Sequence, residues 1–268
     1  MAAHPDVTES LRLLADLTAR VRAELAALPA AAWDAPSNCP PWPVRRLAAH
    51  LVENTLFVRE NVERGVAGSQ EPAVTREERA ARVEALAAAP PAELLAALDR
   101  YSADLAALFE RLSADELERI CYHPAGNRSA RWYAQQRLAE VAFHRWDLLR
   151  SVGQETALDD AVARFLLPML VESNLPRIYA RGPKGHARLT LAATDAPALR
   201  WTLTATPEDL AVQPGDDAAE ATLLGPAAHL ALLIYGRARL PDELAAGRIR
   251  VEGDQAVAER FFALLPGA

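Results

Sequence analysis

The sequence has little of what marks several large classes of protein. It contains two cysteines, Cys39 and Cys121, and a single lysine, Lys184, among 268 residues. Two cysteines allow at most one disulfide in a chain of this length, which is typical of a protein from a reducing compartment. No apolar run has the length of a membrane-spanning helix, and the first residues lack the pattern of a signal peptide. We therefore expect a cytoplasmic protein with no membrane partner.

A net positive charge and the common nucleotide-binding and hydrolase motifs are also missing. The formal net charge is −7, so the protein lacks the positive field that attracts nucleic acid or anionic lipid. The chain contains no Gly-x-Ser-x-Gly turn, P-loop or Gly-x-Gly-x-x-Gly fingerprint. These absences argue against a serine hydrolase, a P-loop nucleotidase and a Rossmann dehydrogenase. Nucleic acid is not an expected partner.

The composition is that of a folded protein with a sizeable core. Hydrophobic residues make up 51% of the chain and charged residues 24%, which is typical of globular domains. At roughly 150 residues for each domain, this length predicts two domains.

The first half of the chain shows the spacing of amphipathic helices. Apolar residues recur every three or four positions in several long segments, as expected when one helix face is buried. Pro43 suits the first turn of one helix, and Gly153 suits the end of another. The charged stretch 71–84 is interpreted as part of a connection. The predicted helices of a mostly antiparallel bundle span residues 6–28, 43–64, 94–112 and 131–152.

The second half changes from helical spacing to alternation of apolar and polar residues. Residues 186–193 and 199–206 are predicted to form a hairpin-like pair of strands. Further strands are predicted at 209–213 and 249–252, and helices at 159–171, 226–235 and 254–265. This mixture predicts an α+β domain.

One helix of the bundle carries a pair of residues suited to metal binding. Glu140 and His144 are four residues apart, so both lie on one helix face, one turn apart. Arg137 and Asp147 share that face. Taken alone, this spacing is more often that of a charged, solvated helix surface than of a metal site.

His50 lies on another predicted helix, beside its apolar stripe. Two imidazoles and one carboxylate form a ligand set that zinc uses in catalytic sites with an open fourth position. Nickel, manganese or ferrous iron can use the same set, because ligand type alone does not choose among them. Asp147 is a candidate partner that would orient one of the ligands. A histidine beside a core stripe is also commonly a structural, hydrogen-bonded residue.

Two segments resemble signatures of the mycothiol-dependent maleylpyruvate isomerase family. They are CPPWPVRRLAAH at 39–50 and EVAFHRWD at 140–147. The resemblance implies an N-terminal DinB-like four-helix bundle at 1–155, followed by a smaller α+β domain at 156–268 that resembles sterol carrier protein. It further implies that His50, Glu140 and His144 bind zinc, and it matches Arg237 to a catalytic arginine. An exposed arginine at a helix end is the alternative interpretation of Arg237.

The chemistry implied by this resemblance is the activation of a thiol. A zinc ion lowers the pKa of the thiol of mycothiol, and the thiolate attacks an electrophilic small molecule. The enzyme would be a cis-trans isomerase or an S-transferase, acting as a monomer or homodimer. Two alternatives stay open: a metal-dependent hydrolase or lyase that uses zinc-bound water, and a non-catalytic protein that binds a small molecule. Cys39, followed by two prolines, is predicted to pack or to line a pocket mouth.

Overall fold

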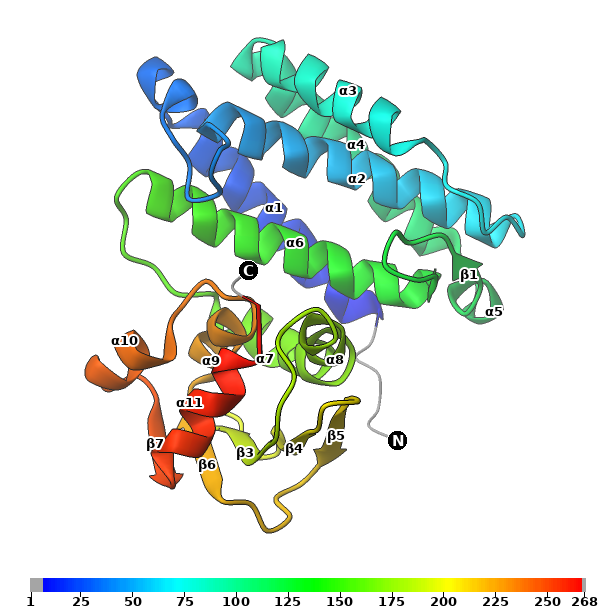
Figure 1. Ribbon diagram of the computed structural model, residues 1–268. Helices are drawn as coiled ribbons and strands as arrows, with labels where there is room; N and C mark the ends of the chain where they lie inside the picture. Colours follow the sequence, from blue (N-terminus) through cyan, green and yellow to red (C-terminus); the bar gives the residue numbers. More distant parts are fainter. Residues whose placement is uncertain (1–6, 267–268) are drawn as a thin grey trace. The chain divides into compact units, whose positions relative to one another are not determined.

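The structure is a computed structural model that describes residues 7–266, and its chain divides into two compact units, Met1–Thr156 and Ala157–Ala268. Figure 1 shows the long helices of the first unit and the sheet and helices of the second. The first unit is helical, and the second combines a sheet with helices. This division into an all-helical part and an α+β part confirms the predicted fold class.

Long helices form the bundle of the first unit. In the part of the chain that the structure describes, they are α1 (Val7–Ala26), α2 (Val44–Val66), α4 (Pro91–Arg111) and α6 (Ala130–Ser151). Helix α1 packs against α4 and α6, and α2 packs against the same two helices. Each helix therefore buries a stripe of side chains against two neighbours, which is the arrangement of a four-helix bundle. The start of the first predicted helix, at residue 6, lies outside the described residues.

The charged connection after α2 contains a helix that the sequence analysis did not predict. Helix α3 (Arg76–Ala88) packs against α2. Thr75 accepts a hydrogen bond from the backbone of Glu78, and Glu78 accepts one from the backbone of Thr75. This capping box satisfies two otherwise unpaired N–H groups and begins the helix.

Short elements connect the long helices, and those just before α6 bring a loop close to α2. They are η1 (Ala30–Asp34), α5 (Ala114–Leu117), β1 (Ile120–Cys121) and β2 (Arg128–Ser129), and the last two pair as a small antiparallel ladder. A side chain at Gly65 of α2 would collide with Cys121. Glycine is thus required for the close approach of β1 to α2. The Ser129 hydroxyl accepts a hydrogen bond from the Trp132 backbone and caps α6.

The second unit is built on a mixed sheet. In its described part, the strand order is β5-β4-β3-β6-β7. The strands are β3 (Ala187–Ala193), β4 (Arg200–Ala205), β5 (Leu210–Pro214), β6 (Ala221–Gly225) and β7 (Arg250–Gly253). The predicted hairpin is confirmed as the antiparallel pair β3 and β4. Strand β6, which pairs in parallel with β3, was not predicted.

Helices complete the second unit. They are α7 (Asp160–Met169), η2 (Leu170–Asn174), α8 (Leu175–Tyr179), α9 (Ala227–Ile234), α10 (Leu240–Ala245) and α11 (Gln255–Ala263). Helix α11 packs against β3 and β6, while α7 packs against α9. Among the described residues, no helix combines the length and apolar character that crossing a membrane requires.

Candidate metal centre

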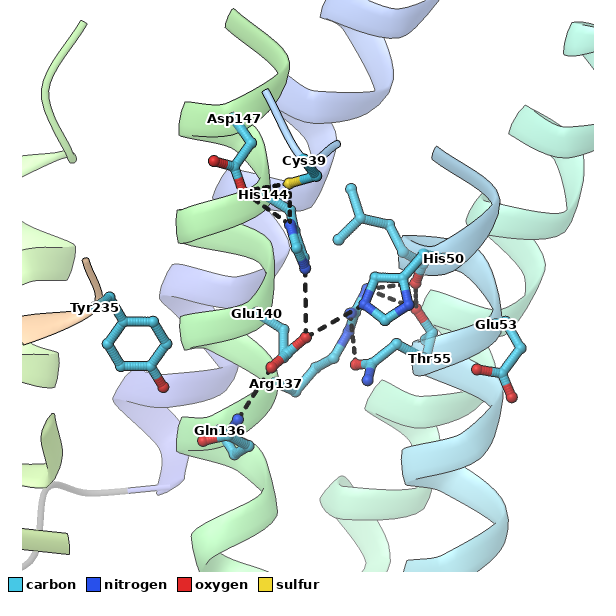
Figure 2. Close-up of polar contacts among 12 residues, drawn as sticks. Cys39, His50, Glu53, Thr55, Gln136, Arg137, Glu140, His144, Asp147 and Tyr235 are labelled. Carbon is cyan, nitrogen blue, oxygen red and sulfur yellow. Dashed lines mark hydrogen bonds and ion pairs between the residues drawn. The ribbon is translucent and has the colours of Figure 1, made fainter. Parts of the chain in front are cut away.

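Helices α2 and α6 bring His50, Glu140 and His144 together inside the first unit (Figure 2). The Oε2 atom of Glu140 lies 3.5 Å from Nε2 of His50 and 3.7 Å from Nε2 of His144. The two imidazole rings meet edge to face, with centroids 4.9 Å apart. Each residue offers one ligand atom, and these three atoms lie within 4.8 Å of one another.

These separations suit a divalent metal ion. Zinc lies about 2.0 to 2.2 Å from nitrogen and oxygen ligands, so neighbouring ligand atoms of a tetrahedral site are roughly 3.3 to 3.6 Å apart. The distances from Glu140 to the two histidines are close to that range. The donor set therefore fits a zinc-like ion with only small side-chain movements.

Asp147 fixes the orientation of the His144 ring. It follows one turn later on α6, and its Oδ2 atom lies 3.0 Å from Nδ1 of His144. The Asp147 side chain is 1% exposed, and its Oδ1 atom accepts a hydrogen bond from Asn38. A carboxylate bound to Nδ1 leaves Nε2 of the same ring available for a metal. The predicted partner of a ligand thus contacts His144.

The turn of α6 before Glu140 supplies two further contacts. The amide of Gln136 donates a hydrogen bond to Oε1 of Glu140 at 3.1 Å, opposite the oxygen that faces the histidines. Arg137 is almost completely buried and donates hydrogen bonds to Asn54, Thr55 and the backbone oxygen of Leu51. The guanidinium therefore joins α6 to α2 (Figure 2).

The electrostatics of the cluster favour metal-binding protonation states. Burial alone would raise the pKa of Glu140, but the hydrogen bond from His50 and the charges of His144 and Arg137 hold it below its ordinary value. Burial lowers the pKa of His50, and the charge of His144 lowers it further. At neutral pH the cluster accordingly presents a carboxylate and an uncharged imidazole at His50, both of which have lone pairs for a cation.

Trp42 and Cys39 also reach this cluster, from the loop that precedes α2. The indole of Trp42 packs against His50 with centroids 5.1 Å apart. Cys39 donates a hydrogen bond to Asp147 at 3.1 Å. Sequence reasoning placed Cys39 only in packing or at a pocket mouth, because a loop residue has no helical spacing that ties it to Asp147. The sequence contained one signal that Cys39 lies near the cluster: it belongs to the segment 39–50, which also contains His50.

Arg237 belongs to the second unit. It follows the end of α9, is partly exposed, and donates a hydrogen bond to the backbone oxygen of Tyr235. Its own backbone N–H donates to Leu232. These two hydrogen bonds hold Arg237 in a defined conformation just after α9.

Family models match both parts of the chain. Residues 14–149 match the mycothiol maleylpyruvate isomerase N-terminal domain, and residues 170–260 match the C-terminal domain of the same family. The chain belongs to the mycothiol-dependent maleylpyruvate isomerase family. This result confirms the resemblance seen in the two sequence segments.

Solved structures agree with this membership. The chain is 18% identical to a mycothiol-dependent maleylpyruvate isomerase of known crystal structure, with a TM-score of 0.68, covering 93% of this chain and 94% of that one. A histidine-to-alanine mutant of the isomerase gives a TM-score of 0.67 at the same identity and coverage. At this identity, the likeness shows a shared fold. A comparison with curated proteins gave no match.

Proposed function

We propose that this protein is a zinc-dependent enzyme that uses mycothiol to isomerise a small cis-configured substrate of the maleylpyruvate type. The observation that carries the proposal is the convergence of His50, Glu140 and His144 in a bundle of this family. Two imidazoles and one carboxylate leave a position of a zinc ion open to an exogenous ligand. An open position is what a small thiol needs in order to bind.

The side chains of the cluster have distinct roles in this proposal. His50, Glu140 and His144 would hold the ion, and Asp147 and Gln136 would keep His144 and Glu140 in their orientations. When bound, the ion and mycothiol would supply a thiolate that adds to the conjugated double bond, permits rotation, and is eliminated from the trans product. Arg237 would bind a substrate carboxylate through a charge-assisted hydrogen bond.

Metal analysis and a turnover assay test the proposal together. The purified protein should contain tightly bound zinc at His50, Glu140 and His144, and it should convert maleylpyruvate to its trans isomer only when mycothiol is present. Accumulation of a mycothiol adduct instead of the isomer would assign the protein to the S-transferases. Turnover that is equally fast without thiol would support zinc-activated water, and a metal-free protein would contradict the proposal.

Asp147→Asn should weaken zinc binding about 10- to 100-fold, the usual effect of losing a carboxylate behind a histidine ligand. The asparagine keeps the size of the side chain but removes the charge that supports His144. Competition with a chromophoric chelator measures the affinity. Asp159→Asn, at the start of α7, is the control and should leave zinc affinity unchanged. Equal zinc affinity in Asp147→Asn and the wild-type protein would show that Asp147 does not support the metal.

Arg237→Leu should raise the KM for a carboxylate substrate about 10- to 100-fold, because hydrogen bonds to charged groups contribute about 1.5 to 3 kcal/mol. Zinc content should stay unchanged, since Arg237 is not one of the three candidate ligands. Steady-state kinetics at saturating mycothiol measure the effect. The exposed Arg239 provides a matched control, and Arg239→Leu should behave like the wild-type protein. Indistinguishable KM values for the two variants would remove Arg237 from the binding site.

A further inference from the structure

The opposite edge of the His144 ring faces a second group of metal-binding atoms. Its Nδ1 atom lies 3.0 Å from Oδ2 of Asp147 and 3.9 Å from Sγ of Cys39. The sulfur lies 3.1 Å from that same carboxylate oxygen. One atom from each residue thus lies in a compact triangle (Figure 2). This triangle is separate from the one formed with Nε2, because it uses the other nitrogen of His144.

The position of Cys39 is set by several contacts of its loop. Its backbone N–H donates to the hydroxyl of Ser37, and its backbone oxygen accepts a hydrogen bond from Trp42. The neighbouring Asn38 binds both the side chain of Asp147 and the hydroxyl of Ser151. The bonds of Asn38 tie the loop to α6, and the bonds of Cys39 to Ser37 and Trp42 fix the loop backbone around the thiol. The sulfur therefore belongs to a defined cluster with the carboxylate and the imidazole.

We propose that Cys39, His144 and Asp147 form a second binding set for a thiophilic divalent cation such as zinc, with His144 bridging the two sets. Thiolate, imidazole nitrogen and carboxylate are all ligands of zinc. With a zinc–sulfur bond of about 2.3 Å, a tetrahedral ion would place these atoms roughly 3.3 to 3.7 Å apart. The observed separations lie on either side of that range, so an ion fits after shifts of about half an ångström in the side chains.

Proton and charge balance are consistent with such a site. Binding the cation displaces one proton from the Cys39 thiol and one from Nδ1 of His144, and both protons go to solvent. The resulting thiolate, imidazolate and carboxylate surround the dication with negative charge. Asp147 is buried, and a buried carboxylate is stabilised strongly by a neighbouring cation.

Hydrogen bonds offer a competing role for the same three residues. Without an ion, the thiol and the Nδ1–H group both donate to Asp147 at ordinary hydrogen-bond distances. In that case Cys39 would only orient the carboxylate. The two roles differ in one observable, because only metal binding converts the thiol into a thiolate ligand.

Cobalt(II) substitution distinguishes these roles. The metal-free protein is dialysed against cobalt(II) with a phosphine reductant and no added thiol, and bound cobalt is counted by elemental analysis. We expect two cobalt ions per chain and a thiolate-to-cobalt charge-transfer band. Cys39→Ser keeps a hydrogen-bond donor but removes the sulfur, so it should bind one cobalt and lose the band. A wild-type protein that binds one cobalt, or shows no band, would overturn the proposal.

Two further variants make the result specific. Cys121→Ser alters the other thiol of the chain and should keep both ions and the band. His50→Ala removes a ligand of the first set only, so it should retain one cobalt together with the band. Because the readouts are cobalt content and absorbance, the result does not depend on mycothiol-dependent turnover. A band that persists in Cys39→Ser would also overturn the proposal.

Discussion

His144→Ala should abolish tight metal binding and lower mycothiol-dependent turnover about a thousandfold. Loss of His144 leaves His50 and Glu140 as a two-ligand site, which holds zinc weakly. The turnover effect corresponds to about 4 kcal/mol, within the several kcal/mol that a metal ion contributes to catalysis. Zinc content after dialysis and turnover of maleylpyruvate with mycothiol measure the two effects.

His186→Ala is the matched control for this substitution. His186 is an exposed histidine just before β3 in the second unit. Its replacement removes an imidazole from the chain and leaves the three residues of the cluster unchanged. We expect wild-type zinc content and turnover in this control. If His144→Ala also retained full metal and full activity, the assignment of the cluster as a metal centre would be wrong.

Helical periodicity predicted part of the candidate site. Glu140 and His144 are related by one turn of a single helix, so their spacing alone places them on one face. His50 is distant in sequence, and its approach to Glu140 depends on the packing of α2 against α6. Periodicity shows which face of each helix is buried, but it does not show which helices are neighbours. The family resemblance supplied that missing relation.

The unpredicted elements show where local patterns become weak. Helix α3 packs mainly on α2 and leaves much of its surface in solvent. Its sequence is therefore rich in charged residues, and the apolar spacing that would mark a helix is weak. Strand β6 is five residues long, and it lies inside the sheet between β3 and β7. Its place comes from parallel pairing with a strand about thirty residues earlier. Its sequence, Ala-Thr-Leu-Leu-Gly, has two adjacent leucines and a glycine, so apolar and polar residues do not alternate regularly along it.

Arg137→Met should lower the free energy of unfolding by about 2 to 4 kcal/mol. The guanidinium is almost completely buried and binds three acceptors on α2, belonging to Asn54, Thr55 and Leu51. Methionine fills similar space but leaves buried acceptors without a donor, and each such group costs about 1 to 3 kcal/mol. Part of this cost is offset because a buried charge is removed. The midpoint of thermal unfolding should fall by roughly 4 to 16 °C.

The unfolding measurement needs a metal chelator, because a bound ion stabilises the folded state by mass action and would hide the effect of Arg137. Arg131→Met on the same helix is the control, since Arg131 makes an ion pair with a mostly exposed Glu118. Such pairs contribute at most about 1 kcal/mol. Arg137→Lys keeps the positive charge but lacks the planar fork that reaches three acceptors, so its stability should lie between those of Arg137→Met and the wild-type protein. Equal stability of Arg137→Met and Arg131→Met would mean that the buried guanidinium does not hold α6 to α2.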